Sequence, residues 1–238
     1  METVTMSVSP SIMLIRQRSF SSKVIIGFIW YNYIMKDYGN GIILSENFVN
    51  SEDSKRLIEW IDNNINKFQQ YYFQYNPKRH ALRFGKDQVF WDSSPHEIAG
   101  IDEIEDLARK YVGAITQALK YIYKRPELYV NSFWLAKQES GAMVKPHHDS
   151  HSEMNPQFTH SVICYLNANE VGGDLEFPEL GINIKPPANS MVSFVSQGED
   201  LLHEVKEINE DRYTMLFWIT DKPEYEVKFH SDVCQLGR

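Results

Sequence analysis

The segment Lys145-Pro146-His147-His148-Asp149 brings two potential metal ligands close together in the chain. In a strand, residues two positions apart point to the same side, so His147 and Asp149 can reach one point while His148 faces away. A histidine and a carboxylate placed in this way supply two of the three ligands of the facial triad that holds non-haem iron. That triad leaves positions on the iron open for a co-substrate and O₂.

Taken alone, the His-x-Asp pattern is weak evidence, because the chain contains competitors. His230-Ser231-Asp232 repeats the pattern, but only six residues follow it and none of them is the further histidine that a triad needs. His151-Ser152-Glu153 is a second local competitor. For any single copy, a solvated surface pair is the more common interpretation.

Two downstream residues favour the first copy. His203 follows the apolar pair Leu201-Leu202 in a predicted strand and is a later histidine that could complete the triad; a satisfied core histidine is the alternative. Arg212 begins an apolar strand that would bury its guanidinium, and a buried arginine needs an anionic partner, for which a carboxylate is well suited. The alternative for Arg212 is a salt bridge to Glu210, Asp211 or another acid.

The same region resembles prolyl 4-hydroxylases of the 2-oxoglutarate oxygenase superfamily. Gly141–Asp149 is similar to the family's glycine-to-HxD segment, Ser161–Asn167 to its "YLN" strand, and Gly172–Glu179 to its "GGxxxFPE" segment. His203-Glu-Val205 and Arg212-Tyr213, followed by Trp218, continue the resemblance in the same order. It covers residues 127–222.

The resemblance implies a role for each matched position. Three residues would ligate Fe(II), namely His147, Asp149 and His203. Arg212 would bind the distal carboxylate of 2-oxoglutarate, with the hydroxyl of Tyr165 as its hydrogen-bonding companion, and Trp218 would form a wall of the pocket near the iron. For Tyr165, a core aromatic with a satisfied hydroxyl is the alternative.

Two positions depart from the family pattern. A family tyrosine that often contacts co-substrate or substrate falls near Lys137-Gln138 and is absent here. The turn after Pro186-Pro187 usually carries glycine, whereas this chain has Ala188-Asn189. Asparagine tolerates the left-handed conformation, so the second departure is mild.

By resemblance, the expected activity is that of a 2-oxoglutarate-dependent dioxygenase. The enzyme would convert 2-oxoglutarate and O₂ to succinate and CO₂ while hydroxylating a substrate C–H bond, and ascorbate would serve as reductant. A peptide or protein substrate carrying proline is implied. The residues that select it are expected in the loops around 150–157 and 79–91.

Helices precede strands along the chain. Asn50 is a plausible N-cap with Glu52 and Asp53 in the first turn, and an apolar stripe follows it. The stripe consists of Leu57, Ile58, Ile61, Ile65, Phe68 and Tyr72. A second helix is predicted from about residue 96 to 122, closed by Arg125-Pro126.

Short segments rich in β-branched and aromatic residues follow Pro126. They are Tyr129–Ala136, Phe158–Leu166, Asp174–Pro178, Ile182–Lys185, Met191–Val195, Leu202–Val205 and Tyr213–Thr220. Helices followed by close-spaced strands predict an α+β fold, namely a jelly roll (a double-stranded β-helix of the cupin type) buttressed by N-terminal helices.

The expected organisation has four parts. They are an uncertain extension or targeting segment (1–35), a helical support region (36–126), the jelly-roll oxygenase core (127–222) and a C-terminal tail (223–238). The first part is basic and rich in serine, as in targeting peptides, but its apolar run Val24–Met35 is shorter than the roughly 20 residues of a membrane span. We therefore expect no stable span and a cytoplasmic location, with organellar or secretory targeting left open.

Composition is that of a globular protein. Of the 238 residues, 42% are hydrophobic and the net charge is −8, so a nucleic-acid partner is disfavoured. The two cysteines are Cys164, expected to be buried, and Cys234 in the tail, so neither a disulfide framework nor a CxxC metal site is present. The sequence sets no oligomeric state.

Three other functions remain open at this stage. The same iron chemistry could act on a nucleic acid or a small molecule, for which the cluster Lys78–Lys86 is the candidate basic patch. A non-catalytic jelly-roll binding module would keep the histidines as structural residues. A zinc hydrolase could use two histidines and one aspartate but needs a general base, and His148 and Glu153 are poor candidates for it.

Overall fold

The computed structural model describes residues 18–26, 29–67, 69–70, 79–85, 101–150, 155–198 and 201–227. All the strands of these residues belong to two sheets, in which neighbouring strands are antiparallel. In spatial order, the large sheet contains β1 (Arg18–Ile26), β2 (Ile29–Asp37), β3 (Ile43–Glu46), β11 (Ser190–Val195), β8 (His160–Tyr165), β13 (Arg212–Thr220), β6 (Tyr129–Gln138), β5 (Arg79–Gly85) and β4 (Gln69–Gln70). The small sheet contains β10 (Ile182–Ile184), β9 (Leu175–Phe177), β12 (His203–Val205) and β7 (Val144–His147).

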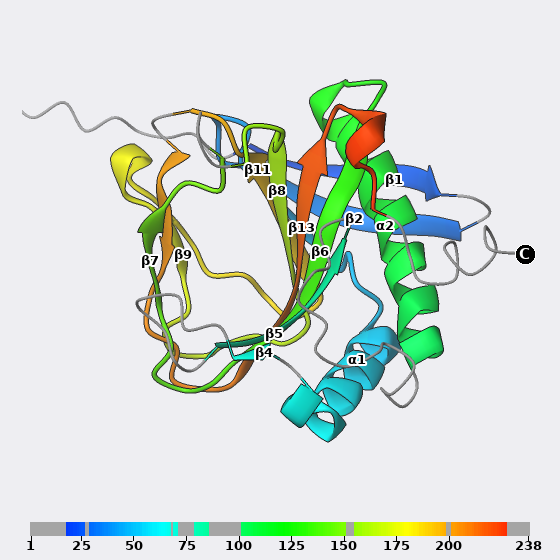
Figure 1. The fold of residues 1–238 in the computed structure, drawn as a ribbon. Coiled ribbons are helices and arrows are strands. Elements are labelled where there is room, and N and C mark those ends of the chain that lie inside the picture. The colour runs from blue at the N-terminus through cyan, green and yellow to red at the C-terminus, as the bar shows by residue number, and fades with distance from the viewer. Residues whose placement is uncertain are drawn as a thin grey trace, which may run out of the picture.

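The elements form three layers (Figure 1). The helices α1 (Ser51–Asn63) and α2 (Ile101–Tyr123) cover one face of the large sheet, and the small sheet faces the other. Strand alternation explains how one sheet serves two cores: in β8, Val162 and Cys164 join the helix-side cluster, whereas Ile163 and Tyr165 join the cluster between the sheets. The predicted α+β jelly-roll fold with helical support is confirmed.

Both helices were expected, with one error in length. The Asn50 side chain accepts hydrogen bonds from the backbone N–H groups of Glu52 and Asp53, so the predicted cap is confirmed. The first helix ends at Asn63 rather than continuing along the apolar stripe. At Asn64 the backbone N–H and the side chain both bond back to the last turn, and a 3₁₀ turn (Ile65–Lys67) follows. The last two stripe residues lie outside the described part of the chain.

The second helix ends at Tyr123, where Lys124 turns the chain with φ 53°, one residue before the expected Arg125-Pro126 stop. Its predicted first turn before Ile101 lies outside the described residues. Among the described helices, none is both long enough and apolar enough to cross a membrane.

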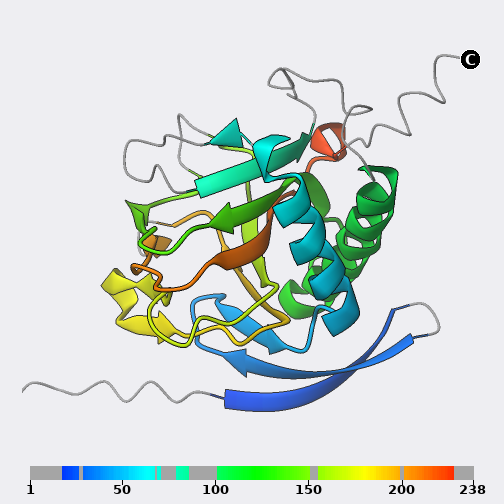
Figure 2. The ribbon, with the colours of Figure 1, turned by 90° about the horizontal axis from the view of Figure 1, so that it is seen from below.

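The N-terminal region contributes strands to the large sheet. β1 and β2 form an antiparallel hairpin whose second strand pairs with β3, and Figure 2 shows this hairpin along one edge of the molecule. The expected boundary between residues 35 and 36 therefore falls inside β2, and the region expected to be helical support also contains β3, β4 and β5. At the other end, Val227 is buried and its backbone N–H donates to the Val130 carbonyl. The first residues of the segment expected to be a tail (223–238) therefore pack against the core.

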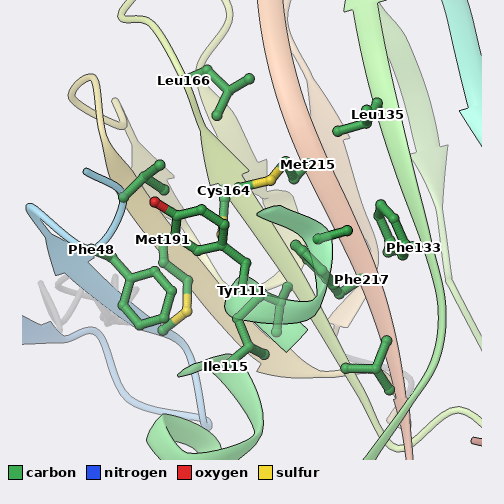
Figure 3. Packing of buried hydrophobic residues seen from close by; sticks show 14 of the residues in the cluster. Phe48, Tyr111, Ile115, Phe133, Leu135, Cys164, Leu166, Met191, Met215 and Phe217 are labelled. Carbon is green, nitrogen blue, oxygen red and sulfur yellow. The ribbon is translucent and has the colours of Figure 1, made fainter. Parts of the chain in front are cut away.

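The helix-side core includes the face of α2 that packs against the large sheet (Figure 3). Tyr111 and Ile115 lie against Cys164 and Met191, all of them almost fully buried. The buried state expected for Cys164 is confirmed, while Cys234 lies outside the described residues. The Tyr111 hydroxyl extends beyond this contact: it donates to Asp53 of α1 at 2.6 Å and accepts from the Asn50 N–H at 3.0 Å, so one hydroxyl joins the two helices.

Tyr111→Phe is expected to lower the free energy of unfolding by about 1–3 kcal/mol, because the Asn50 N–H and the buried Asp53 carboxylate each lose a hydrogen bond. Urea denaturation followed by circular dichroism measures the change. Tyr121→Phe on the exposed side of α2 is the matched control, since Tyr121 is 57% exposed. Equal stabilities of the two variants would contradict this account of how the helices are joined.

His160 gives the fold a pH dependence. It is 3% exposed beside Tyr123, and burial, reinforced by the nearby Arg125 charge, lowers its pKa to about 4 from the usual 6.5 of a histidine. Between these two values the unfolded chain binds a proton at His160 that the folded protein does not, so stability should fall as pH falls through this window. We expect wild type to lose about 1–2 kcal/mol more than His160→Gln between pH 7 and pH 5. Parallel urea curves at the two pH values test this, and identical losses would contradict it.

Candidate active site

The site is assembled by the pairing of β12 with β7. In this ladder His203 lies directly opposite His147, and the two ring centroids are 4.4 Å apart. Asp149 lies between them, with its two carboxylate oxygens 3.7 Å from Nε2 of His147 and 3.6 Å from Nε2 of His203. One ligand atom from each residue falls within 4.8 Å of the others, which is compatible with binding a single metal ion.

The position of Asp149 differs from the expectation that it lies in a strand with His147. β7 ends at His147, and Asp149 lies in the bend that follows. Because β12 begins at His203, opposite His147, the ladder does not continue to Asp149. The bend, rather than strand alternation, brings the carboxylate between the imidazoles.

Backbone hydrogen bonds orient both imidazoles. Nδ1 of His147 lies 2.9 Å from the Lys145 carbonyl, and Nδ1 of His203 lies 3.1 Å from the Leu201 carbonyl. A carbonyl oxygen can only accept, so Nδ1 carries the proton in each ring. The lone pair is left on Nε2, the nitrogen that faces Asp149. Fixing the tautomer in this way is how proteins prepare histidines for metal binding.

The environment keeps His203 neutral and Asp149 ionised. His203 is 3% exposed and packs between Phe177 and Phe194, and this burial lowers its pKa to about 4. Burial alone raises the pKa of Asp149. Attraction to His203 and His147 in their protonated forms, together with hydrogen bonds from Ser161 and Trp218, outweighs this effect and holds that pKa below its usual range. Neutral imidazoles and an ionised carboxylate are the forms that bind metal.

Arg212 is buried on the same side of the large sheet. Its side chain is 2% exposed and donates from Nε to Oε1 of Gln138 at 2.8 Å and from Nη1 to the Gly173 carbonyl at 3.3 Å. Both partners are neutral. Among the described residues, no carboxylate forms an ion pair with Arg212, so the alternative of a salt bridge to Glu210 or Asp211 is not what the structure has.

Tyr165 lies beside Arg212 with an unsatisfied hydroxyl. The Arg212 Cζ is 5.5 Å from the Tyr165 ring centroid. The residue is 1% exposed, and its hydroxyl has no hydrogen-bond partner in the described part of the chain. The alternative of a core tyrosine with a satisfied hydroxyl therefore does not hold. An unpaired cation and an unpaired donor, both buried, suit an anionic ligand such as a carboxylate.

A cleft connects the metal-binding group to Arg212. The three potential ligands and Arg212 line it together with Trp218, and the other lining residues are Arg79, Gln138, Val144, Ser161, Val162, Ile163, Val205, Leu216 and Phe217. Trp218 packs edge-on against Trp134 at 4.9 Å, which fixes its indole on the cleft wall. Tyr165 is not among the lining residues.

Sequence patterns alone missed three polar residues of this cleft. Gln138 was noted only as a departure from the family pattern, and its contact with Arg212 depends on the pairing of β13 with β6. Arg79 lay at the edge of a loop expected to select substrate. Ser161 carried no signal, because it occurs in an otherwise apolar strand. His148 is not part of the metal-binding group, and the two competing motifs, His151–Glu153 and His230–Asp232, lie outside the described residues.

Comparison with known proteins agrees with this geometry. Residues 133–220 match the family model of the 2OG-Fe(II) oxygenase superfamily. Among curated proteins, none is significantly similar in sequence.

Solved structures of prolyl hydroxylases share the fold. The enzyme from Trichoplax adhaerens, in complex with a hypoxia inducible factor peptide fragment, has a TM-score of 0.59 and 20% identity over 78% of this chain and 86% of that chain. The viral collagen prolyl hydroxylase of Paramecium Bursaria Chlorella virus-1, solved with 2OG, has a TM-score of 0.53 and 16% identity over 77% of this chain and 97% of that chain. The Pseudomonas putida prolyl-4-hydroxylase has a TM-score of 0.55 and 17% identity over 77% of this chain and 94% of that chain.

A divalent metal ion such as Mn²⁺ is expected to raise the unfolding temperature of the wild type, because the folded protein gathers ligands that the unfolded chain does not. Asp149→Asn should lose most of this increase, since the amide is a weaker ligand than the carboxylate. His148→Ala, one position away, is the matched control and should keep it. Equal metal responses in both variants would contradict the assignment of ligands, and thermal unfolding with and without metal provides the measurement.

Proposed function

With residues 133–220 of the chain identified as a 2OG-Fe(II) oxygenase domain of prolyl 4-hydroxylase-like fold, we propose that the protein hydroxylates peptidyl proline. The reaction would consume 2-oxoglutarate and O₂ and release succinate and CO₂. The observation that carries the proposal is the arrangement of His147, Asp149 and His203, in which both histidines direct Nε2 toward one carboxylate.

The donor set supports Fe(II) as the metal. Two neutral imidazoles and one carboxylate from one side of an ion match the facial triad of non-haem iron oxygenases, which leaves the other side for co-substrate and O₂. His147, Asp149 and His203 would be the three ligands. Phe177 and Phe194 pack against the His203 imidazole and help to orient this ligand.

Arg212 and Tyr165 fit the role of co-substrate residues. A dicarboxylate such as 2-oxoglutarate would chelate the metal through its oxo-acid end and present its distal carboxylate to the guanidinium. The buried Tyr165 hydroxyl, which no described residue satisfies, would donate to the same carboxylate. This arrangement would satisfy two buried polar groups at once, which is the chemical reason to expect a dicarboxylate rather than a monocarboxylate.

Bound iron and 2-oxoglutarate would supply the oxidising chemistry, and the protein would bind, orient and exclude water. Trp218 forms a rigid wall beside Asp149, supported by Trp134 and Phe158. Ser161 and Trp218 keep the carboxylate ionised and oriented. Ascorbate is proposed as the reductant that restores Fe(II) after turnovers without substrate.

Peptidyl proline is proposed as the substrate because the fold neighbours are prolyl hydroxylases, one of them solved with a peptide. The net charge of −8 is also unfavourable for a nucleic-acid substrate. Arg79 lines the cleft and offers a donor for a peptide carbonyl.

The cofactor site is tested by adding Fe(II) and 2-oxoglutarate without oxygen and recording the weak visible charge-transfer band of a metal-chelated 2-oxo acid. His203→Ala should abolish the band. Arg212→Ala should require at least about 30-fold more 2-oxoglutarate, because a buried ionic contact is lost. Arg125→Ala, which removes an exposed arginine paired with Asp221, is the control and should behave as wild type.

Absence of the band in folded, metal-loaded wild type would contradict the proposed cofactor chemistry and favour a zinc hydrolase or a binding module.

The substrate is tested separately by succinate release. A proline-containing peptide should stimulate release and gain the mass of one oxygen, whereas the same peptide with alanine for proline should do neither. Equal stimulation by both peptides would exclude proline as the hydroxylated residue.

A further inference from the structure

Gln138 is a buried side chain that forms a hydrogen bond with Arg212. It is 2% exposed at the end of β6, and its Oε1 accepts the Arg212 Nε–H at 2.8 Å. A guanidinium can only donate hydrogen bonds, so the orientation of the amide is determined by chemistry: Oε1 faces Arg212, and the amide nitrogen points away.

The contact is part of a row across three strands. In the register of the large sheet, Arg212 of β13 lies opposite Gln138 of β6, which in turn lies opposite Arg79 of β5. All three side chains line the cleft. The guanidinium of Arg79 lies 5.4 Å from the Trp134 ring, so the row has a cation on each side of one neutral amide.

The neutrality of Gln138 matters because buried arginines are usually compensated by acids. In the described part of the chain, the hydrogen-bond acceptors of Arg212 are an amide oxygen and the Gly173 carbonyl. Two of the five guanidinium N–H groups are used in these bonds. The cation is therefore oriented by its neighbours but not neutralised by them.

We infer that Gln138 is a positioning residue for co-substrate binding: its amide orients Arg212 and leaves the positive charge to the distal carboxylate of 2-oxoglutarate. The inference rests on the proposed function. A carboxylate at position 138 could accept the same hydrogen bond but would compete with the co-substrate for the guanidinium.

The test substitutes Gln138→Glu, which keeps the size of the side chain and an acceptor oxygen while adding a negative charge. Affinities for 2-oxoglutarate and for pyruvate are measured from the anaerobic charge-transfer band with Fe(II). Pyruvate chelates metal in the same way but has no distal carboxylate. We expect 2-oxoglutarate to bind at least about 30-fold more weakly and pyruvate to change by less than about threefold.

Gln117→Glu makes the same substitution on the exposed side of α2 and is the matched control, with both affinities expected at the wild-type values. Gln138→Leu removes the acceptor without adding charge, so its preference for 2-oxoglutarate over pyruvate should fall by a smaller factor than in Gln138→Glu. If Gln138→Glu does not fold, Gln138→Leu carries the test. A preference unchanged from wild type would then overturn the inference.

The outcomes separate this inference from the proposed function. A wild-type protein without the band would contradict the cofactor chemistry itself. A wild-type band together with unchanged 2-oxoglutarate affinity in Gln138→Glu would overturn only the role of Gln138. Equal losses of affinity for 2-oxoglutarate and pyruvate would also overturn it, because they would indicate general damage to the cleft rather than competition for Arg212.

Discussion

The pairing of β12 with β7 is the constraint on which the site depends. It places His203 opposite His147 although the two residues are far apart in sequence, and the bend after β7 then brings Asp149 between them. The small sheet that contains this pair is held against the large sheet by the cluster that includes Phe177 and Phe194. These two rings also contact the His203 imidazole. Packing between the sheets and metal-ligand geometry are thus set by the same side chains.

The cleft has opposite charges at its two ends. Asp149, between the Nε2 atoms of two imidazoles, makes one end suitable for a cation, and Arg212 makes the other suitable for an anion. Burying Arg212 beside neutral partners and leaving the Tyr165 hydroxyl without a partner among the described residues both cost stability. Such violations of the rules for stable cores are expected at functional sites, where a ligand satisfies the buried groups. Elsewhere in the jelly roll, strand alternation places apolar side chains in the two core clusters.

Local patterns predicted much of this structure from sequence. Short local patterns predicted the Asn50 cap and the strands after Pro126. The convergence of His147, Asp149 and His203 was predicted from motifs that occur in the same order as in the resembling family. The end of the first helix did not follow from periodicity, because the apolar stripe continues past Asn63. Features that depend on strand pairing were also missed. The β1–β2 hairpin joins the large sheet because β2 pairs with β3. The contact between Gln138 and Arg212 exists only because β13 pairs with β6.

The most direct test of the central claim is an anaerobic crystal structure with Mn²⁺ in place of Fe(II) and with 2-oxoglutarate. The account predicts one metal ion at roughly 2.0–2.2 Å from Nε2 of His147, Nε2 of His203 and a carboxylate oxygen of Asp149. It also predicts the distal carboxylate of 2-oxoglutarate on the Arg212 guanidinium. A metal bound through His148, or a co-substrate that leaves Arg212 without an anion, would contradict it.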